Sequence, residues 1–501
     1  DTQLVIPESL GAAILNDKGY IIEAEKPIYV SVRLQSQAQA GAIVSKGGAA
    51  LSDSFLFGGF VNFNPIQFEY NNFFSVMAIE DDTEVTVEFP KGVALSNYRG
   101  SYPVSFKLEK NESFVGILEA VNDPNNIDGL IGGKLTSTKD VAVISGSTTG
   151  TNGTGMGHDY GIDQLVGTEN AGKEFIFIRG ESPKTVGGNP YYSIENIVLV
   201  PLVAGTTYVA NNGPATPITG DYAVIEGDAY NNNDNMYVVT SDPVMAFQVI
   251  GGVPSRLINP EPNQGMFVVP PLNCTAKGEI NNIPFINRIG PTNPQNGGIG
   301  IVAETRNDVF LNGSLLSGAQ PTENPNYVTY RISGLDQNLY DVNSTGELYV
   351  SYFTYRGSST SGGFYSGFQS APEFVFDVDL VALGPCLQNN LTLNASGVSG
   401  LDSFEWWYNP DAEEDPAKWQ KIPSTANINS LTPSQIGWYQ LRGVFFCGSI
   451  SDTLVSNPVY IGNCPEDNDD DGIPDNLDLD EDNDGVLDSE ESGGGFVFNL
   501  S

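Results

Sequence analysis

Histidine, cysteine and long apolar runs are scarce in this 501-residue chain. The one histidine, His158, lies in a Gly-His-Asp-Tyr segment, and a lone histidine leaves few of the usual triads or histidine metal sites. The four cysteines are Cys274, Cys386, Cys447 and Cys464, and no two of them form a C-x-x-C pair, so zinc is disfavoured. Since no run of 18 apolar residues occurs, the sequence predicts no membrane-spanning helix.

Basic residues are also few: 22 Lys and Arg stand against 61 Asp and Glu, for a formal net charge of −39. A basic stripe that could neutralise phosphates is missing, which excludes nucleic acid as a partner. Anionic lipid would repel such a surface. The chain also opens without a basic and then apolar signal segment, so an exported protein would be seen here after cleavage of its signal.

The acidic residues are densest near the end of the chain. One pattern occurs there twice, and the two copies begin 13 residues apart. Each copy has acids at positions 1, 3, 5, 9 and 12, glycine at 6 and an apolar residue at 7, which is the oxygen-rich loop that Ca²⁺ prefers. The predicted calcium ligands are Asp467, Asp469, Asp471, Ile473 (through its carbonyl), Asp475 and Asp478, then Asp480, Asp482, Asp484, Val486 (through its carbonyl), Asp488 and Glu491.

A disordered acidic tail is the alternative for this segment. Such a tail would not place glycine at the sixth position twice, each time before an apolar residue. Amphipathic helices do not flank the loops, and Pro474 interrupts the first one. Residues 464–492 therefore resemble thrombospondin type 3 repeats, which implies calcium as the cofactor and an extracellular location.

The remainder of the chain predicts an all-β fold. Short β-branched and aromatic runs, such as Thr83–Phe89, Phe175–Ile178 and Glu347–Phe353, alternate with Gly, Asn, Asp and Pro clusters. With 56 glycines and 31 prolines, long helices are not expected. One short helical turn is predicted at Gly161–Val166.

An internal repeat organises this β-rich region. Four segments share a polar turn followed by an apolar strand, and aligning Ile28, Val141, Val244 and Leu348 gives spacings of 113, 103 and 104 residues. A second shared element is a polar tip before an alternating strand, at Glu80, Ala204 and Glu304. Such periods fit repeated β-sandwich or propeller-like modules, although chance likeness between strand-turn-strand sequences is the alternative.

Three segments of this region carry a resemblance to a known family: residues 157–167, 235–244 and 263–274. They are similar to the N-terminal region of flavobacterial surface proteins related to the IgGFc-binding domain, among them the SprB-like giant adhesins of gliding Bacteroidetes. The resemblance implies type 9 secretion and attachment to surfaces during gliding. We assign residues 1–375 to it, and immunoglobulin binding is not expected.

Residues 376–463 resemble an immunoglobulin-like sandwich, with strands predicted at 374–383, 391–395, 404–408, 438–446 and 454–461. Either Trp406 or Trp407 would be the buried tryptophan of the third strand, and residues 437–439 resemble the tyrosine corner. Similar bacterial modules imply a Cys386–Cys447 disulfide, against the alternative of two free buried thiols. A second bridge between Cys274 and Cys464 would clamp the calcium repeats to the first region. Residues 493–501 look like the start of a further segment.

Catalytic residues are not expected. The pair Asp81 and Asp82 is typical of a turn tip. Asp159 and Asp163 could act as a glycosidase pair, but turn caps and side-chain-to-backbone hydrogen bonds are the favoured interpretation. Phe364 and Tyr365, in a Gly/Ser-rich loop, could stack on a sugar, although a plain hairpin is favoured.

These features together predict a non-enzymatic, calcium-stiffened adhesin outside the cell, at the cell surface. Its expected partner is a polysaccharide, a solid surface or another envelope protein, without direct membrane insertion. Two alternatives remain: a secreted polysaccharide-active enzyme with accessory modules, and a structural region that docks an envelope assembly partner.

Overall fold

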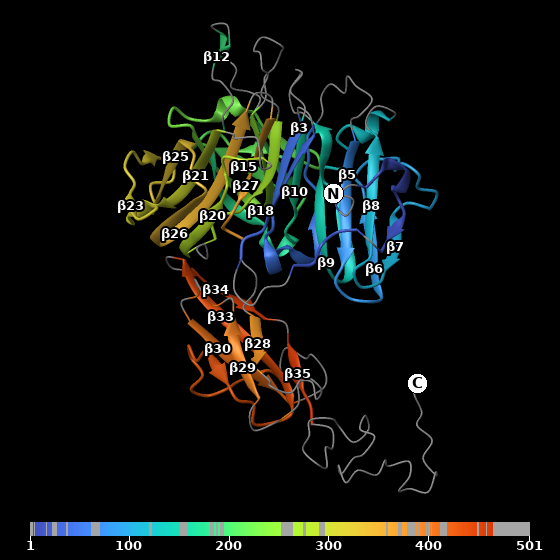
Figure 1. Cartoon of the computed structure of the whole chain (residues 1–501), viewed down its shortest axis with the longest axis vertical. Coiled ribbons are helices and arrows are strands. Elements are labelled where there is room, and N and C mark those ends of the chain that lie inside the picture. The colour runs from blue at the N-terminus through green and yellow to red at the C-terminus, as the bar shows by residue number, and fades with distance from the viewer. Residues whose placement is uncertain are drawn as a thin grey trace, which may run out of the picture. The chain divides into compact units, whose positions relative to one another are not determined.

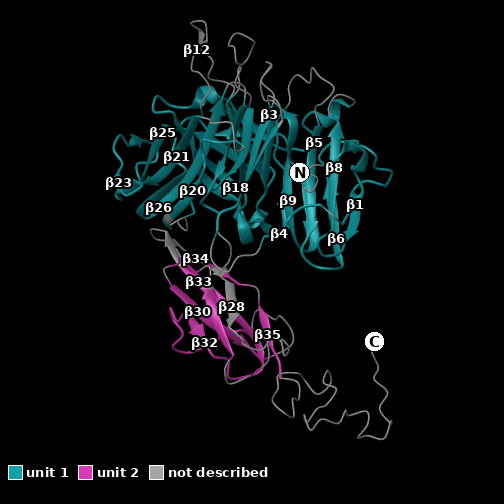
Figure 2. Cartoon of the chain, viewed as in Figure 1, with its two compact units in different colours: residues 1–370 teal, residues 371–501 magenta. Residues whose placement is uncertain are grey.

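The computed structural model describes residues 4–463 apart from 5, 17, 23–27, 37–38, 62–70, 120–122, 151–158, 181–184, 187–188, 191–194, 252–263, 274–276, 290–295, 357–358, 369–372, 378–386, 388–390, 397, 399–400, 402, 411–417, 448–449 and 457. Two compact units divide the chain, residues 1–370 and 371–501 (Figure 2). The predicted all-β class is confirmed, because strands make up both units. Within the described residues the helical elements are 3₁₀ turns, at η1 (Glu8–Leu10), η2 (Gly47–Ala50), η3 (Pro124–Asn126), η4 (Thr168–Asn170) and η5 (Gly227–Ala229).

Unit 1 contains three similar modules, each a sheet of seven or eight strands built on one long strand. The long strands are β9 (Lys134–Gly150), β18 (Asn235–Gly251) and β26 (Leu339–Arg356) (Figure 1). Each pairs with four neighbours, two along its first half and two along its second half. The repeated modules inferred from the sequence are therefore present.

The other strands of unit 1 complete these sheets. Module 1 has β1 (Ile14–Leu15), β4 (Leu51–Leu56), β5 (Asn71–Ala78), β6 (Thr83–Glu88), β7 (Val104–Leu108), β8 (Ser113–Glu119) and β10 (Asp159–Gln164). Module 2 has β11 (Gly172–Ile178), β14 (Ile197–Pro201), β15 (Thr207–Ala210), β16 (Thr216–Pro217), β17 (Ala223–Ile225) and β19 (Gln264–Val269). Module 3 has β20 (Lys277–Pro284), β21 (Asn296–Glu304), β22 (Val309–Leu311), β23 (Ser314–Leu315), β24 (Gln320–Pro321), β25 (Tyr327–Leu335) and β27 (Ser359–Phe364). Two hairpins stand apart, β2 (Ser31–Ser36) with β3 (Gln39–Val44), and β12 (Thr185–Val186) with β13 (Asn189–Pro190).

The predicted polar turns of the repeat lie inside the long strands, which corrects the sequence interpretation. In each module the pairing register shifts there, between Ser52 and Ser54, Gly172 and Glu174, or Lys277 and Glu279 of the neighbouring strand. A hydroxyl marks each shift: Ser137 Oγ donates to the Lys139 carbonyl at 2.7 Å, and Thr240 Oγ1 to the Asp242 carbonyl at 2.8 Å. In module 3, Ser344 Oγ accepts from the Gly346 N–H at 3.3 Å. A β-bulge bends a strand without ending it, so polar residues persist within one continuous strand.

The first predicted copy of the repeat is not a fourth module. Ile28 precedes strand β2 and is 54% exposed, whereas its three counterparts are buried in long strands. This part of the chain forms the β2–β3 hairpin. In chain order, β2 corresponds to the end of a long strand such as β9, and β3 corresponds to the strand that follows it, such as β10.

Four strands pack around the centre of unit 1, and each comes from a different part of the chain. β3 lies against β10 and β27, and β19 lies against the same two strands. β10 replaces the helical turn predicted at Gly161–Val166. The backbone of β10 lies very close to the ring of Phe60 at Gly161. A Cβ atom added to Gly161 would overlap that ring. The N-terminal hairpin therefore fills the fourth place in a ring whose other three places belong to the modules.

Unit 2 is a two-sheet sandwich, and its strands fall where the immunoglobulin-like pattern predicts them. One sheet has the order β28-β29-β32, and the other has β31-β30-β33-β34 with β35 also on β33. Their bounds are β28 (Glu373–Asp377), β29 (Thr392–Ser396), β30 (Ser403–Asn409), β31 (Gln420–Lys421), β32 (Ser430–Leu431), β33 (Gly437–Cys447), β34 (Ile450–Val455) and β35 (Val459–Ile461). The single strand predicted at 454–461 is thus divided between β34 and β35.

Two aromatic residues of unit 2 occupy the places of the core tryptophan and the corner tyrosine of an immunoglobulin-like sandwich. Trp406 is fully buried in the core between the sheets. Tyr439 donates its hydroxyl proton to the Gln435 carbonyl at 2.7 Å, which is the hydrogen bond of a tyrosine corner. Of the two tryptophans left open by the sequence, Trp406 is therefore the core residue.

Candidate functional site

The predicted calcium loops and most cysteines fall outside the described residues. This holds for all twelve calcium ligands, from Asp467 to Glu491, and for Cys274, Cys386 and Cys464. Cys447 ends strand β33, but its proposed partner Cys386 is not described. The calcium sites and both disulfides stay predictions. The described residues contain no group of three or more His, Cys, Asp or Glu side chains that could hold a metal ion.

Asp159, one of the two carboxylates singled out in the sequence, is completely buried on β10. Its Oδ1 accepts from the backbone N–H groups of Ala40 on β3 and Tyr160, and its Oδ2 accepts from Thr360 on β27 at 3.1 Å. One side chain therefore joins three of the four central strands. The favoured interpretation, side-chain-to-backbone hydrogen bonding, is confirmed for this residue.

Asp163, at the other end of β10, performs the same task for the fourth strand. Its Oδ2 accepts from Val268 N–H on β19 at 2.9 Å, and its Oδ1 pairs with Lys46 Nζ at 2.7 Å. The two charged side chains are 2% and 1% exposed. Burial raises the pKa of Asp163 and lowers the pKa of Lys46, while the attraction between them opposes both shifts. The two aspartates of β10 together therefore connect this strand to β3, β27 and β19.

The sequence analysis missed two cations, Lys46, whose side chain is buried, and Arg33, which is half-buried. Arg33 on β2 donates to the carbonyls of Pro284 at 2.8 Å and Arg288 at 2.7 Å, and its guanidinium lies 5.1 Å from the ring centre of Tyr352. These contacts fix the N-terminal hairpin onto module 3. Because the partners lie about 250 residues further along the chain, no local signal in the sequence could have revealed them.

Phe364 and Tyr365 are not available for sugar stacking, which corrects that alternative. They are 5% and 6% exposed. Phe364 packs edge-on against Phe267 with ring centres 5.6 Å apart, and Tyr365 lies 5.3 Å from Tyr352. Both rings belong to the core beside the central strands, where β27 ends. The favoured interpretation, a plain hairpin, fits β26 and β27, which pair directly.

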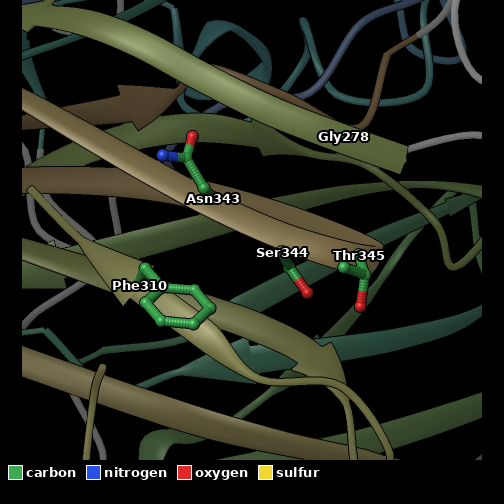
Figure 3. A pocket seen from close by; sticks show the side chains of 5 residues that line it. All are labelled: Gly278, Phe310, Asn343, Ser344 and Thr345. Atoms are coloured by element: carbon green, nitrogen blue, oxygen red, sulfur yellow. The ribbon is translucent and has the colours of Figure 1, made fainter. Parts of the chain in front are cut away.

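A pocket of about 360 Å³ opens at the register shift of module 3 (Figure 3). Its lining residues are Gly278, Phe310, Asn343, Ser344 and Thr345, from strands β20, β22 and β26. Asn343 Oδ1 has no hydrogen-bond partner there. The pocket is mostly apolar around Phe310, with the Ser344 and Thr345 hydroxyls beside it.

Module 2 shows why this pocket exists. Lys173 occupies the equivalent place, between Gly172 and Glu174 on β11, and its Nζ donates to the Ser241 carbonyl at 2.9 Å. In module 3 the residue in that place is Gly278, whose φ of 106° suits glycine. The pocket is therefore a space that a side chain covers in the neighbouring module.

Three solved structures show weak likenesses to this chain. The D1–D4 ectodomain fragment of ICAM-5 is 6% identical with a TM-score of 0.11, over 78% of this chain and 99% of that one. A Salmonella alpha-2-macroglobulin reacted with methylamine is 11% identical with a TM-score of 0.13, over 77% and 28%. The BSP domain of a biofilm associated protein is 9% identical with a TM-score of 0.13, over 83% and 96%. TM-scores this low do not indicate a common fold, and no curated protein matches the chain.

The chain also matches a protein family. The family model described as IgGFc binding protein matches residues 47–354, from the start of η2 to near the end of β26, and so covers the long strands and most of the other strands of the three modules. The described residues include no helix long and apolar enough to cross a membrane. Because the match covers more than half of the sequence, the chain belongs to the IgGFc-binding protein family.

Proposed function

We propose that the protein is a non-enzymatic adhesin of the cell surface, and that unit 1 is the part that holds its partner. The family match over residues 47–354 is the observation that carries this proposal. It assigns the three modules as a whole to a family named for binding, so a partner protein or a polysaccharide is the expected ligand. We do not propose immunoglobulin as the ligand, because the only support for it is the wording of the family description.

The construction of unit 1 supports a binding role that needs a firm platform. Asp159, Asp163, Lys46 and Arg33 all use their charges to join strands that are far apart in sequence. The two carboxylates that could have served as an acid/base pair are thus occupied by backbone donors. A unit braced in this way keeps its central strands in a fixed arrangement, and preorganisation of a binding unit lowers the free energy lost on binding.

Residues 464–492, which follow the sandwich of unit 2 in the chain, would serve as a calcium-dependent joint. Fourteen acidic residues and no basic ones repel each other there, and Ca²⁺ at extracellular millimolar levels would occupy such loops and hold them together. We further propose export by the type 9 system and a role in gliding, which rest on the resemblance of residues 157–167, 235–244 and 263–274.

The adhesin proposal is tested on intact cells and on the purified chain. Protease treatment of intact cells should remove the protein, since it is proposed to lie outside. Purified residues 1–501 should bind to the producing organism's polysaccharide, to glass or to an envelope fraction, and should compete with cells for attachment. Retention of the protein after protease treatment, or attachment that the purified chain does not inhibit, would contradict the proposal.

A further inference from the structure

The pocket at the register shift of module 3 lies where a lysine side chain is found in module 2. Lys173 and Gly278 occupy equivalent places, because each directly precedes the glutamate at which strand pairing resumes, Glu174 or Glu279. The Nζ atom of Lys173 donates to the carbonyl of Ser241 at 2.9 Å. Since glycine has no side chain to make this contact, position 278 supplies no cation to module 3.

Module 3 nevertheless keeps acceptors for such a cation. Thr345 takes the place of Ser241, which stands 104 residues earlier, and it lines the pocket (Figure 3). The side-chain oxygen Oδ1 of Asn343 is buried and has no hydrogen-bond partner, although the equivalent residue of module 2 is the apolar Val239. A buried acceptor without a donor costs free energy. A donor group that enters the pocket would remove this cost.

The apolar wall of the pocket carries a larger side chain than its counterpart in module 2. Phe310 on β22 pairs with Asn343, and the residue in the same place on β15 is Val209, which pairs with Val239. Long aliphatic stems such as that of lysine pack on apolar surface while the charged end stays beside polar atoms. An aromatic ring also attracts a nearby cation. The wall therefore suits an alkyl chain that ends in a donor.

Charge favours a cationic ligand in this pocket. The described residues that line it, Gly278, Phe310, Asn343, Ser344 and Thr345, are all neutral, and the last three carry side-chain oxygens. The chain as a whole has a formal charge of −39, which attracts cations and repels anions. A neutral alkyl chain would fill the apolar part but leave Oδ1 of Asn343 without a donor. An aliphatic ammonium group meets both requirements.

We propose that this pocket binds a lysine side chain of the partner that unit 1 holds. The alkyl stem would pack on Phe310, and the ammonium group would donate to Oδ1 of Asn343 and to the carbonyl of Thr345, as Lys173 donates to Ser241 in module 2. The proposal rests on the adhesin function and deepens it. It narrows the partner to a protein that presents exposed lysines.

The test measures binding of a lysine derivative to the purified full chain by saturation-transfer difference NMR. The probe is Nα-acetyl-lysine methylamide, and its controls are the norleucine and glutamate derivatives, which lack the ammonium group or reverse the charge. We expect saturable binding of the lysine derivative with a Kd of about 1–10 mM, the range for one small side chain. The norleucine derivative should bind about tenfold more weakly, because it makes no charged hydrogen bond. The glutamate derivative should give no saturable signal.

Two substitutions introduce the residues that module 2 has at the equivalent places. Asn343→Val removes the unpaired acceptor, Phe310→Val removes most of the apolar wall, and each should weaken binding about tenfold. Glu84→Gln removes one negative charge from the exposed side of β6 and should leave the Kd unchanged. This control separates the pocket from a general attraction of cations to an acidic chain, and circular dichroism melting identifies any variant that fails to fold.

The lysine proposal is overturned if the lysine derivative gives no saturable signal, if the norleucine derivative binds equally well, or if folded Asn343→Val and Phe310→Val both bind like the parent. Binding of the probe by the purified chain does not depend on where the protein resides in the cell. If cells attach through the chain but the probe does not bind, the lysine proposal is refuted and the adhesin function stands. If the probe binds while protease treatment of intact cells leaves the protein in place, the adhesin function fails instead.

Discussion

Buried charged residues in unit 1 act as fasteners between strands. Beside Asp159 and Asp163, Glu195 accepts from the N–H groups of Gly180 at 2.9 Å and Gly251 at 2.6 Å, which joins the ends of β11 and β18. Hydrogen bonds that a carboxylate accepts from backbone N–H groups are among the stronger ones in proteins. Sequence alone could single out the two aspartates of β10 but not their partners, because Ala40, Lys46, Val268 and Thr360 lie more than 100 residues away.

Replacement of Lys46 should show how much one fastener contributes. In Lys46→Met, the carboxylate of Asp163 stays buried without its cation, and we expect unit 1 to lose about 3–5 kcal/mol of unfolding free energy. Urea unfolding followed by circular dichroism measures the loss. The double variant Lys46→Met/Asp163→Asn should be more stable than Lys46→Met, because it removes the uncompensated charge. A single variant within about 0.5 kcal/mol of the parent would refute the role given to this pair.

Asp140, in the bulge of β9, gives a pH dependence with a definite sign. Partial burial, then the nearby carboxylates of Asp53 and Glu80, raise its pKa above the ordinary 3.8. The folded state therefore takes up a proton more readily than the unfolded state, and stability falls as the pH rises from 3.8 through the raised pKa. Asp140→Asn should stabilise unit 1 at pH 7 and flatten the pH profile of melting. Glu84→Gln, on the exposed side of β6, is the control because it removes the same net charge. It should have a smaller effect on the stability at pH 7 and on the pH profile of melting.

At the scale of elements, the three bulged long strands define the modules. The sequence interval of 103 and 104 residues located them correctly, because the hydroxyl residues Ser137, Thr240 and Ser344 recur with the same spacing. The polar segments of the repeat were predicted as turns but are bulges within the long strands. Segments such as Thr-Lys-Asp and Ser-Asp-Pro favour turns as readily as bulges. Only the pairing register of four neighbouring strands distinguishes the two.

Strand β10 illustrates a second limit of sequence patterns. Glycine at 161 weakens the strand pattern locally and favours a turn, but in the structure it allows the close approach of Phe60 from another segment. Tertiary packing thus overrides local propensity at this site. The pocket at Gly278 was unpredictable for the same reason, since its walls come from three strands.

A single methyl group should therefore disturb the centre of unit 1. Gly161→Ala places a Cβ into the ring of Phe60, and we expect a loss of about 1–3 kcal/mol from overpacking. Gly92→Ala is the matched control, because no heavy atom lies within 4 Å of its added Cβ. Thermal melting of unit 1 by circular dichroism compares the two variants. Equal melting temperatures would show that β10 can move to accommodate the methyl group.

At the scale of the whole molecule, the distribution of tryptophan offers a test of independence. All four tryptophans are in unit 2, whereas most strands are in unit 1. If the two compact units unfold separately, tryptophan emission should follow unit 2 and circular dichroism should mostly follow unit 1. We expect two urea transitions that do not coincide. Coincident transitions would mean that the units unfold together.

Chelation of calcium should affect only the acidic end of the chain. With EGTA, limited proteolysis should cut within residues 464–492 much faster, because unneutralised carboxylates repel one another. Unit 1 should keep its resistance, since the ligands proposed for calcium lie outside it. Asp471→Asn and Asp484→Asn should mimic part of the EGTA effect in the presence of calcium. Equal cleavage with and without EGTA would count against the calcium loops.

The N-terminal hairpin also has a consequence for how the molecule is made. Arg33 reaches Pro284, 251 residues later, and Asp159 reaches Thr360, 201 residues later. A chain that emerges from the ribosome in order cannot form these contacts until nearly all of unit 1 has been synthesised. Such high sequence separation slows folding. Unit 1 should therefore remain incompletely folded for most of its synthesis, because the hairpin cannot complete its contacts until β20 and β27 have been made.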